Sequence, residues 1–212
     1  MSESSIFGMQ GGKDPKDPNS GFVILAADAN SVISGMIVAL TDSDKLMQLD
    51  DHKIFGSVGT PGDMVQFGEY IQKNMSLNRL RMGTPHTVGA AANFTRSELA
   101  TALRRGPYQV NVMLGGFDKD AGPSLYYIDY LANMQEVPFA GHGYGNMFCM
   151  STMDRYHSWD MSEQSAKDCI SKCIEQVRNR LILQTTEYVV KIVDKDGVRD
   201  VTEEVMGMVT RT

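Results

Sequence analysis

The sequence predicts an α+β fold of four layers, in which two sheets face each other and helices cover both outer faces. The expected elements come in groups along the chain: strands, two helices, strands, two helices and strands again. A doubly wound sheet requires strands and helices to alternate singly, so the grouped order favours the layered αββα sandwich. The continuously apolar run Phe22–Ala27 agrees, because such a run is typical of a strand buried on both faces.

The first two expected strands are Ile6–Gln10 and Phe22–Ala27, which we expect to pair as a hairpin. The connecting segment, residues 11–21, is rich in Gly, Pro, Asp and Asn, the residue types of turns. It has almost nothing to bury, so the sequence predicts a surface loop here.

Lys53–Thr60 reads as the next strand and leads into a helix. The Thr60 side chain is expected to cap this helix, and Pro61 suits the first turn. An apolar stripe follows along the helix: Val65, Phe67, Ile71 and Met75. A second helix is predicted over Val88–Arg105 and ends at the Gly-Pro pair that follows.

Two more strands, Tyr108–Phe117 and Ser124–Asp129, flank a turn rich in Asp and Gly. The next helix, Tyr144–Tyr156, reads as apolar nearly all round. The helix after it, Ser162–Leu183, has the strongest helical period in the chain, at Ala166, Cys169, Ile170, Cys173, Ile174 and Val177.

The last two strands are Tyr188–Val193 and Val198–Val201, and the Asp196-Gly197 pair between them is a strong hairpin signal. Residues 202–212 are expected to form a C-terminal tail that frays or reaches a neighbouring molecule. The whole of residues 1–212 is expected to form a single domain.

The composition of the chain argues against nucleic-acid binding and against insertion in a membrane. The chain has 212 residues, with 20 Lys and Arg against 26 Asp and Glu, which gives a net charge of −6. An acidic chain is a poor general binder of nucleic acid, so we expect no nucleic-acid partner. No apolar run approaches the ~20 residues that cross a bilayer, and Met1–Ser5 does not resemble a secretory signal. We therefore expect no membrane partner.

The three cysteines, Cys149, Cys169 and Cys173, are expected to be free thiols packed in the core. We expect no metal and no cofactor, because no set of ligands has a suitable spacing.

The loose acidic cluster around Lys45 is expected to be solvated or salt-bridged: it comprises Asp42, Asp44, Asp50 and Asp51. His142 is expected to be a loop histidine with satisfied hydrogen bonds.

Several stretches of the chain are similar to the proteasome beta subunits, a family with the N-terminal nucleophile hydrolase fold. They run from about Ile6 to Val201: Phe22–Asp28, Gly59–Asp63, Gly116–Asp118, Gly122–Asp129, Gly143–Gly145, Met153–Arg155 and Asp194–Gly197. Phe67–Asn74 and Ala91–Arg96 resemble the type-2 branch of that family. The resemblance implies the four-layer fold, with residues 11–21 as an inserted loop. It also implies the fourth position of the beta ring and no catalytic role.

The family's chemistry requires an N-terminal threonine, freed by cleavage of a propeptide, and a nearby lysine and aspartate. The resemblance places Ser4 at the position of the threonine, with Ser5 beside it. The preceding residues 1–3 contain no Gly-Thr cleavage junction. Asp28 matches the family aspartate, and Lys45 matches the lysine at a spacing one residue longer than in most active relatives.

The supporting positions differ more. Tyr144 stands where the family has a serine between two glycines. Arg180 falls near a later aspartate, where an arginine would repel Lys45, and Leu183 falls near the following serine. Asp28 and Lys45 then form either a relic of an active site or a structural buried ion pair, and we favour the ion pair.

The resemblance implies a non-catalytic structural subunit of the 20S proteasome core particle. Such a subunit supports ubiquitin-dependent protein degradation by its catalytic neighbours. Its partners would be neighbouring beta subunits, the alpha ring and the opposite beta ring of a 28-subunit particle, in the cytoplasm and nucleus. One alternative is an active peptidase that uses a processed Ser4 or Ser5. Another is a stand-alone binding module.

Overall fold

The structure is a computed structural model. It describes residues 5–14, 17, 20–28, 30–33, 36–41, 45–181 and 187–209, and between residues 29 and 44 it describes the backbone alone.

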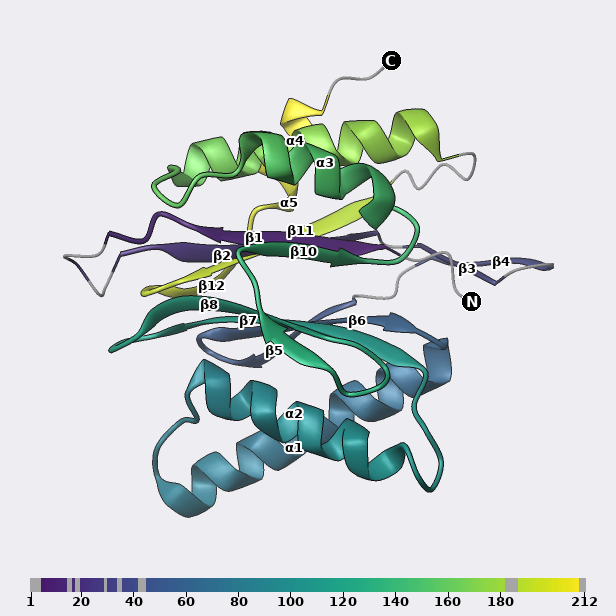
Figure 1. Ribbon diagram of the computed structural model, residues 1–212, viewed down its shortest axis with the longest axis vertical. Coiled ribbons are helices and arrows are strands. Elements are labelled where there is room, and N and C mark those ends of the chain that lie inside the picture. The colour runs from purple at the N-terminus through teal and green to yellow at the C-terminus, as the bar shows by residue number, and fades with distance from the viewer. Residues whose placement is uncertain are drawn as a thin grey trace.

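Two five-stranded antiparallel sheets lie face to face, and helices cover the outer face of each (Figure 1). The first sheet has the order β10-β1-β2-β11-β12. Its strands are β1 (Ile6–Gly11), β2 (Phe22–Asp28), β10 (Phe139–His142), β11 (Tyr188–Asp194) and β12 (Gly197–Asp200). The four-layer fold predicted from the sequence is confirmed.

The second sheet has the order β5-β6-β7-β8-β9. Its strands are β5 (Leu46–Asp50), β6 (Lys53–Gly59), β7 (Val110–Asp118), β8 (Gly122–Ile128) and β9 (Met134–Glu136). A separate hairpin pairs β3 (Asn30–Ile33) with β4 (Met36–Thr41).

Helices α1 (Pro61–Met82) and α2 (Val88–Ala102) lie against the second sheet, and α3 (Asn146–Tyr156) and α4 (Glu163–Arg180) lie against the first. A short helix, α5 (Thr202–Met208), follows β12 and packs beside α4 and β11. Among the described residues, no helix combines the length and the apolar character needed to span a bilayer.

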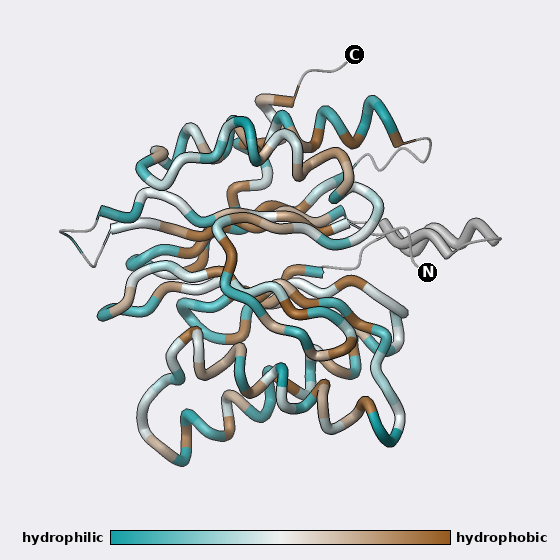
Figure 2. The backbone as a smooth tube through the Cα atoms, in the orientation of Figure 1, coloured by the Kyte–Doolittle hydropathy of each residue, from teal (hydrophilic) through white to brown (hydrophobic). Residues whose placement is uncertain are grey.

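Apolar residues concentrate on the inner strands and on the helix faces that meet them (Figure 2). One core lies between the sheets and includes Ile6, Leu25 and Met113. A second lies between the first sheet and α3, α4 and α5, and a third lies between the second sheet and α1 and α2. Each sheet therefore buries both faces, as the apolar run of β2 indicated.

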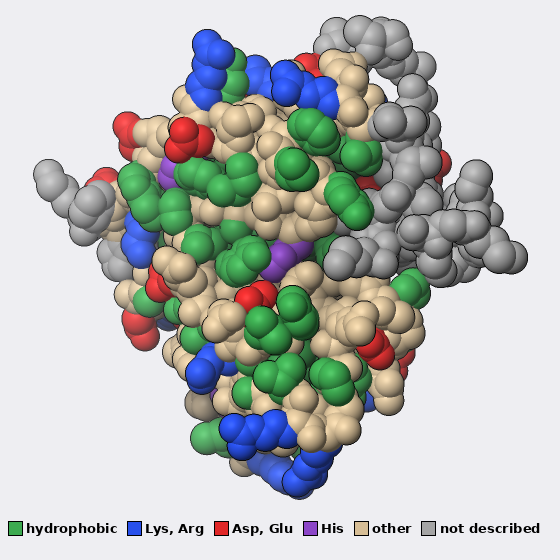
Figure 3. Space-filling view, turned by 45° about the vertical axis from the view of Figure 1, so that its right-hand side comes forward, with side chains coloured by type: hydrophobic (Ala, Val, Ile, Leu, Met, Phe, Trp, Pro, Cys, Tyr) green, Lys and Arg blue, Asp and Glu red, His purple; other side chains and the backbone are tan. Residues whose placement is uncertain are grey.

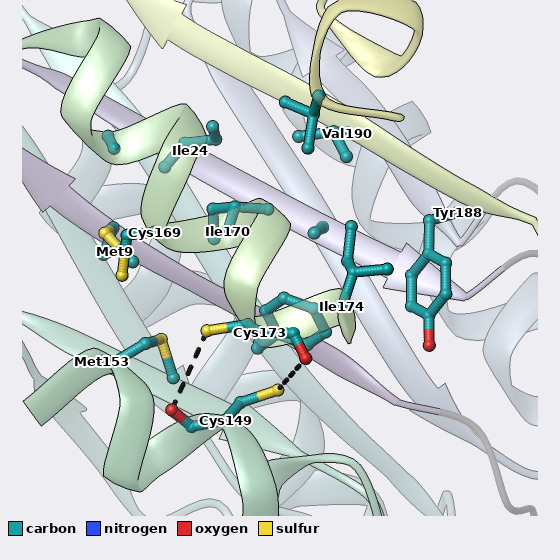
Figure 4. Close-up of a cluster of buried hydrophobic side chains, with 14 of the residues drawn as sticks. Met9, Ile24, Cys149, Met153, Cys169, Ile170, Cys173, Ile174, Tyr188 and Val190 are labelled. Atoms are coloured by element: carbon teal, nitrogen blue, oxygen red, sulfur yellow. Dashed lines mark hydrogen bonds between the residues drawn. The ribbon is translucent and has the colours of Figure 1, made fainter. Parts of the chain in front are cut away.

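The three cysteines lie in the core below α3 and α4, as the sequence predicted (Figure 4). The Cys149 thiol lies 3.9 Å from the carbonyl oxygen of Cys173, and the Cys173 thiol lies 3.9 Å from the carbonyl oxygen of Cys149. Hydrogen bonding and burial raise the pKa of both Cys169 and Cys173. These thiols are therefore held in their neutral, unreactive form.

Two helix details differ from the sequence expectation. The Thr60 side chain makes no capping hydrogen bond at α1; only its carbonyl serves the helix, by accepting the amide of Met64. Helix α3 is not buried all round, although its sequence is largely apolar: Met147 is 76% exposed and only Cys149, Thr152 and Met153 are buried. A helix on the outside of a sandwich buries only one face, whatever its other face contains.

The expected C-terminal tail is also different, because most of it forms α5. Val201, Val205 and Val209 are buried in the core beside α4 and β11. The Lys167 ammonium lies 2.7 Å from Glu163 and 2.6 Å from Glu204, which ties α5 to α4. A spacing of four residues puts the valines on one helix face, a pattern too short to stand out in the sequence.

The described residues of the loop at 11–21 include Lys13, Asp14 and Asp17, all exposed. The Lys13 amide donates to the carbonyl of Trp159 at 3.2 Å, and the Ser20 hydroxyl bonds the backbone of Asp17 at 2.7 Å. The β1–β2 hairpin on either side pairs from Ile6–Ala27 to Gly11–Phe22. That this loop is an insertion stays a prediction.

Candidate functional site

The candidate site forms where the start of β1 meets the end of β2. The antiparallel pairing of Ile6 with Ala27 brings the preceding Ser5 opposite Asp28. The Ser5 amide donates to Asp28 Oδ1 at 2.9 Å, and the Asp28 amide donates to the Ser5 carbonyl at 3.1 Å. These two bonds fix the Asp28 carboxylate beside the beginning of the first strand.

Lys45 reaches this carboxylate from the other sheet. It directly precedes β5, and its carbonyl accepts the amide of Ser57 in β6 at 3.1 Å. Its ammonium donates to Asp28 Oδ1 at 2.6 Å. The ion pair therefore connects the two sheets at one end of the sandwich.

Both charged groups are buried: Asp28 is 2% exposed and Lys45 is 3% exposed. Burial raises the pKa of Asp28 and lowers the pKa of Lys45, because water no longer stabilises either charge. Their mutual attraction opposes both shifts. The buried ion pair favoured from the sequence is present.

Ser5 is held on a second side by the turn between β10 and α3. The Gly145 amide donates to the Ser5 hydroxyl oxygen at 2.8 Å. Gly145 is the residue before α3, and a β-carbon there would lie 2.6 Å from that oxygen. A glycine is therefore needed for this close approach. Ser5 is 1% exposed, so its hydroxyl is enclosed by protein.

Two of the remaining candidate positions are described, Tyr144 and Arg180. Tyr144 precedes Gly145 in the turn, and its side chain is 44% exposed. Arg180, at the end of α4, is exposed, with its guanidinium 6.0 Å from the Phe148 ring centroid. Burial lowers the pKa of Lys45, and Asp28 opposes that shift. The expected repulsion between Arg180 and Lys45 stays a prediction. Ser4 and Leu183 lie outside the described residues.

His142 differs from the loop histidine expected from the sequence. It ends strand β10 and is 4% exposed. Its Nε2 lies 3.2 Å from the Val112 carbonyl of the opposite sheet, and its ring stacks on Tyr127 with centroids 4.0 Å apart. Burial lowers the pKa of His142 to about 4. The neutral imidazole is thus a second polar link between the sheets.

Two members of the acidic cluster expected around Lys45 are described, Asp50 and Asp51, and each forms an ion pair. Asp50 lies at the far end of β5 and pairs with Lys53 at 2.9 Å. Asp51 is exposed and lies 3.9 Å from Arg79. Asp42 and Asp44 lie outside the described residues. Among the described residues, no group of His, Cys, Asp and Glu is arranged to hold a metal ion.

Sequence reasoning missed the contact between Ser5 and Gly145. These residues are 140 positions apart, and no local pattern connects them. The available signal was the pair of glycines around Tyr144, which indicates a turn where the backbone approaches something closely.

An αββα sandwich whose first strand begins beside a buried Asp–Lys pair defines a protein of the N-terminal nucleophile hydrolase type. Comparison with known proteins agrees. A family model described as "Proteasome subunit" matches residues 19–193. The chain therefore belongs to the proteasome subunit family.

The curated relatives are beta subunits. Proteasome subunit beta type-2-B of Arabidopsis thaliana is 49% identical over 195 residues, covering 92% of this chain and 94% of the relative. Proteasome subunit beta type-2 of Oryza sativa subsp. japonica is 50% identical over 179 residues, covering 84% of each chain. Proteasome subunit beta type-4 of Saccharomyces cerevisiae is 38% identical over 180 residues, covering 84% of this chain and 91% of the relative. The resemblance to the beta type-2 branch is confirmed, and membership implies assembly with other proteasome subunits.

Proposed function

We propose that this chain is a non-catalytic structural subunit of the 20S proteasome core particle. It packs at the fourth position of the beta ring and supports ubiquitin-dependent protein degradation by catalytic neighbours. The observation that carries the proposal is the enclosure of Ser5. Its amide is bonded to Asp28, its hydroxyl oxygen accepts from Gly145, and 1% of the residue is exposed.

A nucleophile of this family needs a free amine and a hydroxyl that a substrate carbonyl can approach. In this chain the backbone nitrogen of Ser5 serves as a peptide N–H donor, and its hydroxyl faces a backbone amide. Tyr144, at the position of a family serine, is 44% exposed. Asp28 and Lys45 then act as a structural link between sheets rather than as catalytic groups.

Assembly requires surfaces that other subunits cover. Hydrophobic side chains gather on one face of the molecule (Figure 3). The large hydrophobic residues that are at least 44% exposed include Tyr130, Leu131, Tyr144 and Met147. Such exposure on a protein of this size supports burial against partners. We assign as partners the neighbouring beta subunits, the alpha ring and the opposite beta ring, in the cytoplasm and nucleus. Nucleic acid and membranes are not partners in this proposal.

The alternative is an active peptidase that uses a processed Ser4 or Ser5. One observation favours it: Asp28 and Lys45 lie in direct contact, at 2.6 Å, as the family chemistry requires. Cleavage before either serine would free an amine and rearrange the segment around Asp28.

Intact-mass analysis of the chain recovered from its native particle tests the proposal. The particle is also treated with a covalent probe directed at N-terminal nucleophiles, and labelling of the catalytic subunits serves as the positive control. The proposal predicts a mass that retains Ser4 and the residues before it, and no probe adduct on this chain. A mass that begins at Ser4 or Ser5, with an adduct of one probe molecule, would establish the alternative.

A further inference from the structure

A charged groove lies at the end of the sandwich away from the Asp28–Lys45 pair. Strand β5 connects the two places, since Lys45 precedes the strand and Asp50 ends it. The groove has a volume of about 520 Å³, within the range of about 300–1,000 Å³ that is typical of small-molecule sites. We propose that this groove binds a small polyphosphate anion.

Four separate segments build the groove: the β5–β6 turn, the α1–α2 connection, the β7–β8 turn and the β11–β12 turn. They are bonded to one another. The His52 carbonyl accepts the Phe117 amide at 3.0 Å, and His52 Nε2 lies 3.2 Å from the Lys195 carbonyl. The Asp51 carbonyl accepts the Val198 amide at 3.1 Å. The walls are thus fixed by backbone contacts across both sheets rather than by one flexible loop.

The acidic residues of the wall are already engaged. Both carboxylate oxygens of Asp118 accept the Val88 amide at the start of α2, at 3.0 and 2.9 Å. Asp50 accepts from the Lys53 ammonium at 2.9 Å and from the His52 amide at 2.9 Å. The carboxylates of Asp118 and Asp50 are thus hydrogen-bonded to groups of the groove wall, which reduces their repulsion of a bound anion.

Three basic residues of the lining are exposed and can turn toward a ligand. Within the part of the chain that the structure describes, Lys119 and Lys195 have no carboxylate partner, and both are exposed. Among the described residues, Arg79 is paired with Asp51 alone, at 3.9 Å, and the two side chains are 48% and 83% exposed. An exposed pair at that distance contributes little, so a stronger anion can replace Asp51.

The arrangement favours phosphate over a single carboxylate. Arg79, Lys119 and Lys195 come from three different segments, so one ligand must present several charged oxygens in different directions. A chain of two or three phosphates does this, and guanidinium and ammonium groups are suited to phosphate oxygens. His86 lines the same groove and supplies a further N–H donor.

The test measures binding of inorganic tripolyphosphate to the full chain by isothermal titration calorimetry at low salt. The double variant Lys119→Gln/Lys195→Gln is compared with a control of equal charge change, Lys73→Gln/Lys172→Gln. The control lysines lie on α1 and α4 and do not line the groove. Citrate is titrated in parallel as a tricarboxylate.

We expect tripolyphosphate to bind the parent chain and the control with equal affinity, and to bind the groove variant at least ~10-fold more weakly. Binding should also weaken as salt is added, since ions screen exposed charges. Equal weakening in both double variants would show a general charge effect and overturn the proposal. Absence of binding to the parent chain at millimolar ligand would overturn it too. Citrate binding as tightly as tripolyphosphate would refute the choice of phosphate.

Discussion

The Gly145 amide donates a hydrogen bond of 2.8 Å to the hydroxyl oxygen of Ser5, and both groups are buried. This contact joins the start of the first strand to the start of α3. Helix α3 has no side-chain cap of its own, because Gly145 stands at the capping position. The Ser5 hydroxyl therefore takes the place of a side-chain cap at the start of α3 and connects the first sheet to the helix layer above it.

We expect Ser5→Ala to lower the free energy of unfolding by about 1–3 kcal/mol, because the buried Gly145 amide loses its acceptor. Urea unfolding of the chain measures this change. Ser151→Ala is the matched control, since Ser151 is an exposed residue of α3 that bonds the Phe148 carbonyl. The control should change stability by less than about 0.5 kcal/mol. Equal effects of the two variants would show that the Ser5 bond is not structural.

The buried pair of Asp28 and Lys45 gives a sharper test. Lys45→Met leaves the Asp28 carboxylate buried without its cation, which should cost about 3–5 kcal/mol. Adding Asp28→Asn removes the charge but keeps an oxygen that can accept the Ser5 amide. We therefore expect the double variant to be more stable than Lys45→Met alone, as measured by urea unfolding.

A surface pair serves as the control for this cycle. Lys73 lies 2.5 Å from Glu69 on α1, and both side chains are exposed. Lys73→Met should change the free energy of unfolding by less than about 0.5 kcal/mol. If adding Asp28→Asn makes the Lys45→Met variant even less stable, the unpaired charge of Asp28 is not the reason that Lys45→Met loses stability.

The sequence predicts the layers well because most elements carry strong local signals. The Ser162 side chain caps α4 by accepting the Ser165 amide, and the stripe from Ala166 to Val177 is buried as its period indicated. The hairpin at Asp196-Gly197 is present as well, with Gly197 at a φ of 112° that favours glycine. Each of these features is contained within a few turns of chain.

The elements that were missed are short or depend on distant partners. Strands β9 and β10 have three and four residues, too few to establish a period of two. Strand β5 places polar Gln48 and Asp50 among its apolar residues, which hides the alternation. Asp28 and Lys45 were predicted as a pair through family resemblance, whereas the role of His142 depends on Val112 and Tyr127, which no local pattern connects to it.

His142 should make stability depend on pH. Its pKa is about 4 in the folded chain and 6.5 ordinarily, so the unfolded chain binds more protons between these values. This stability is fully present above pH 6.5 and is lost as the pH falls through about 4, by about 3 kcal/mol in all. The hydrogen bond to the Val112 carbonyl and the attraction of Asp129 both favour a protonated ring, but they only partly oppose burial.

Urea unfolding of the parent chain and of His142→Gln, at pH 7 and pH 4.5, tests this dependence. Glutamine keeps a donor for the Val112 carbonyl but does not titrate. The stability advantage of the parent chain over His142→Gln should shrink by about 2 kcal/mol at the lower pH. An unchanged difference between the parent chain and His142→Gln would rule out the histidine as the source.

Helix α5 should belong to the cooperative fold rather than behave as a tail. Val205 is fully buried against the core beside α4 and β11. Val205→Ala removes two methyl groups, which costs roughly 2 kcal/mol including the cavity, and the higher helix propensity of alanine returns about 0.5 kcal/mol. We expect a net loss of about 1–2 kcal/mol in urea unfolding. Glu203→Ala, on the exposed side of the same turn, should cost less than about 0.5 kcal/mol. If Val205→Ala and Glu203→Ala both change stability by the same small amount, α5 leaves the core before the rest of the chain unfolds. In that case the contacts of Val205 would already be lost before the main unfolding transition, and removing them would not change its free energy.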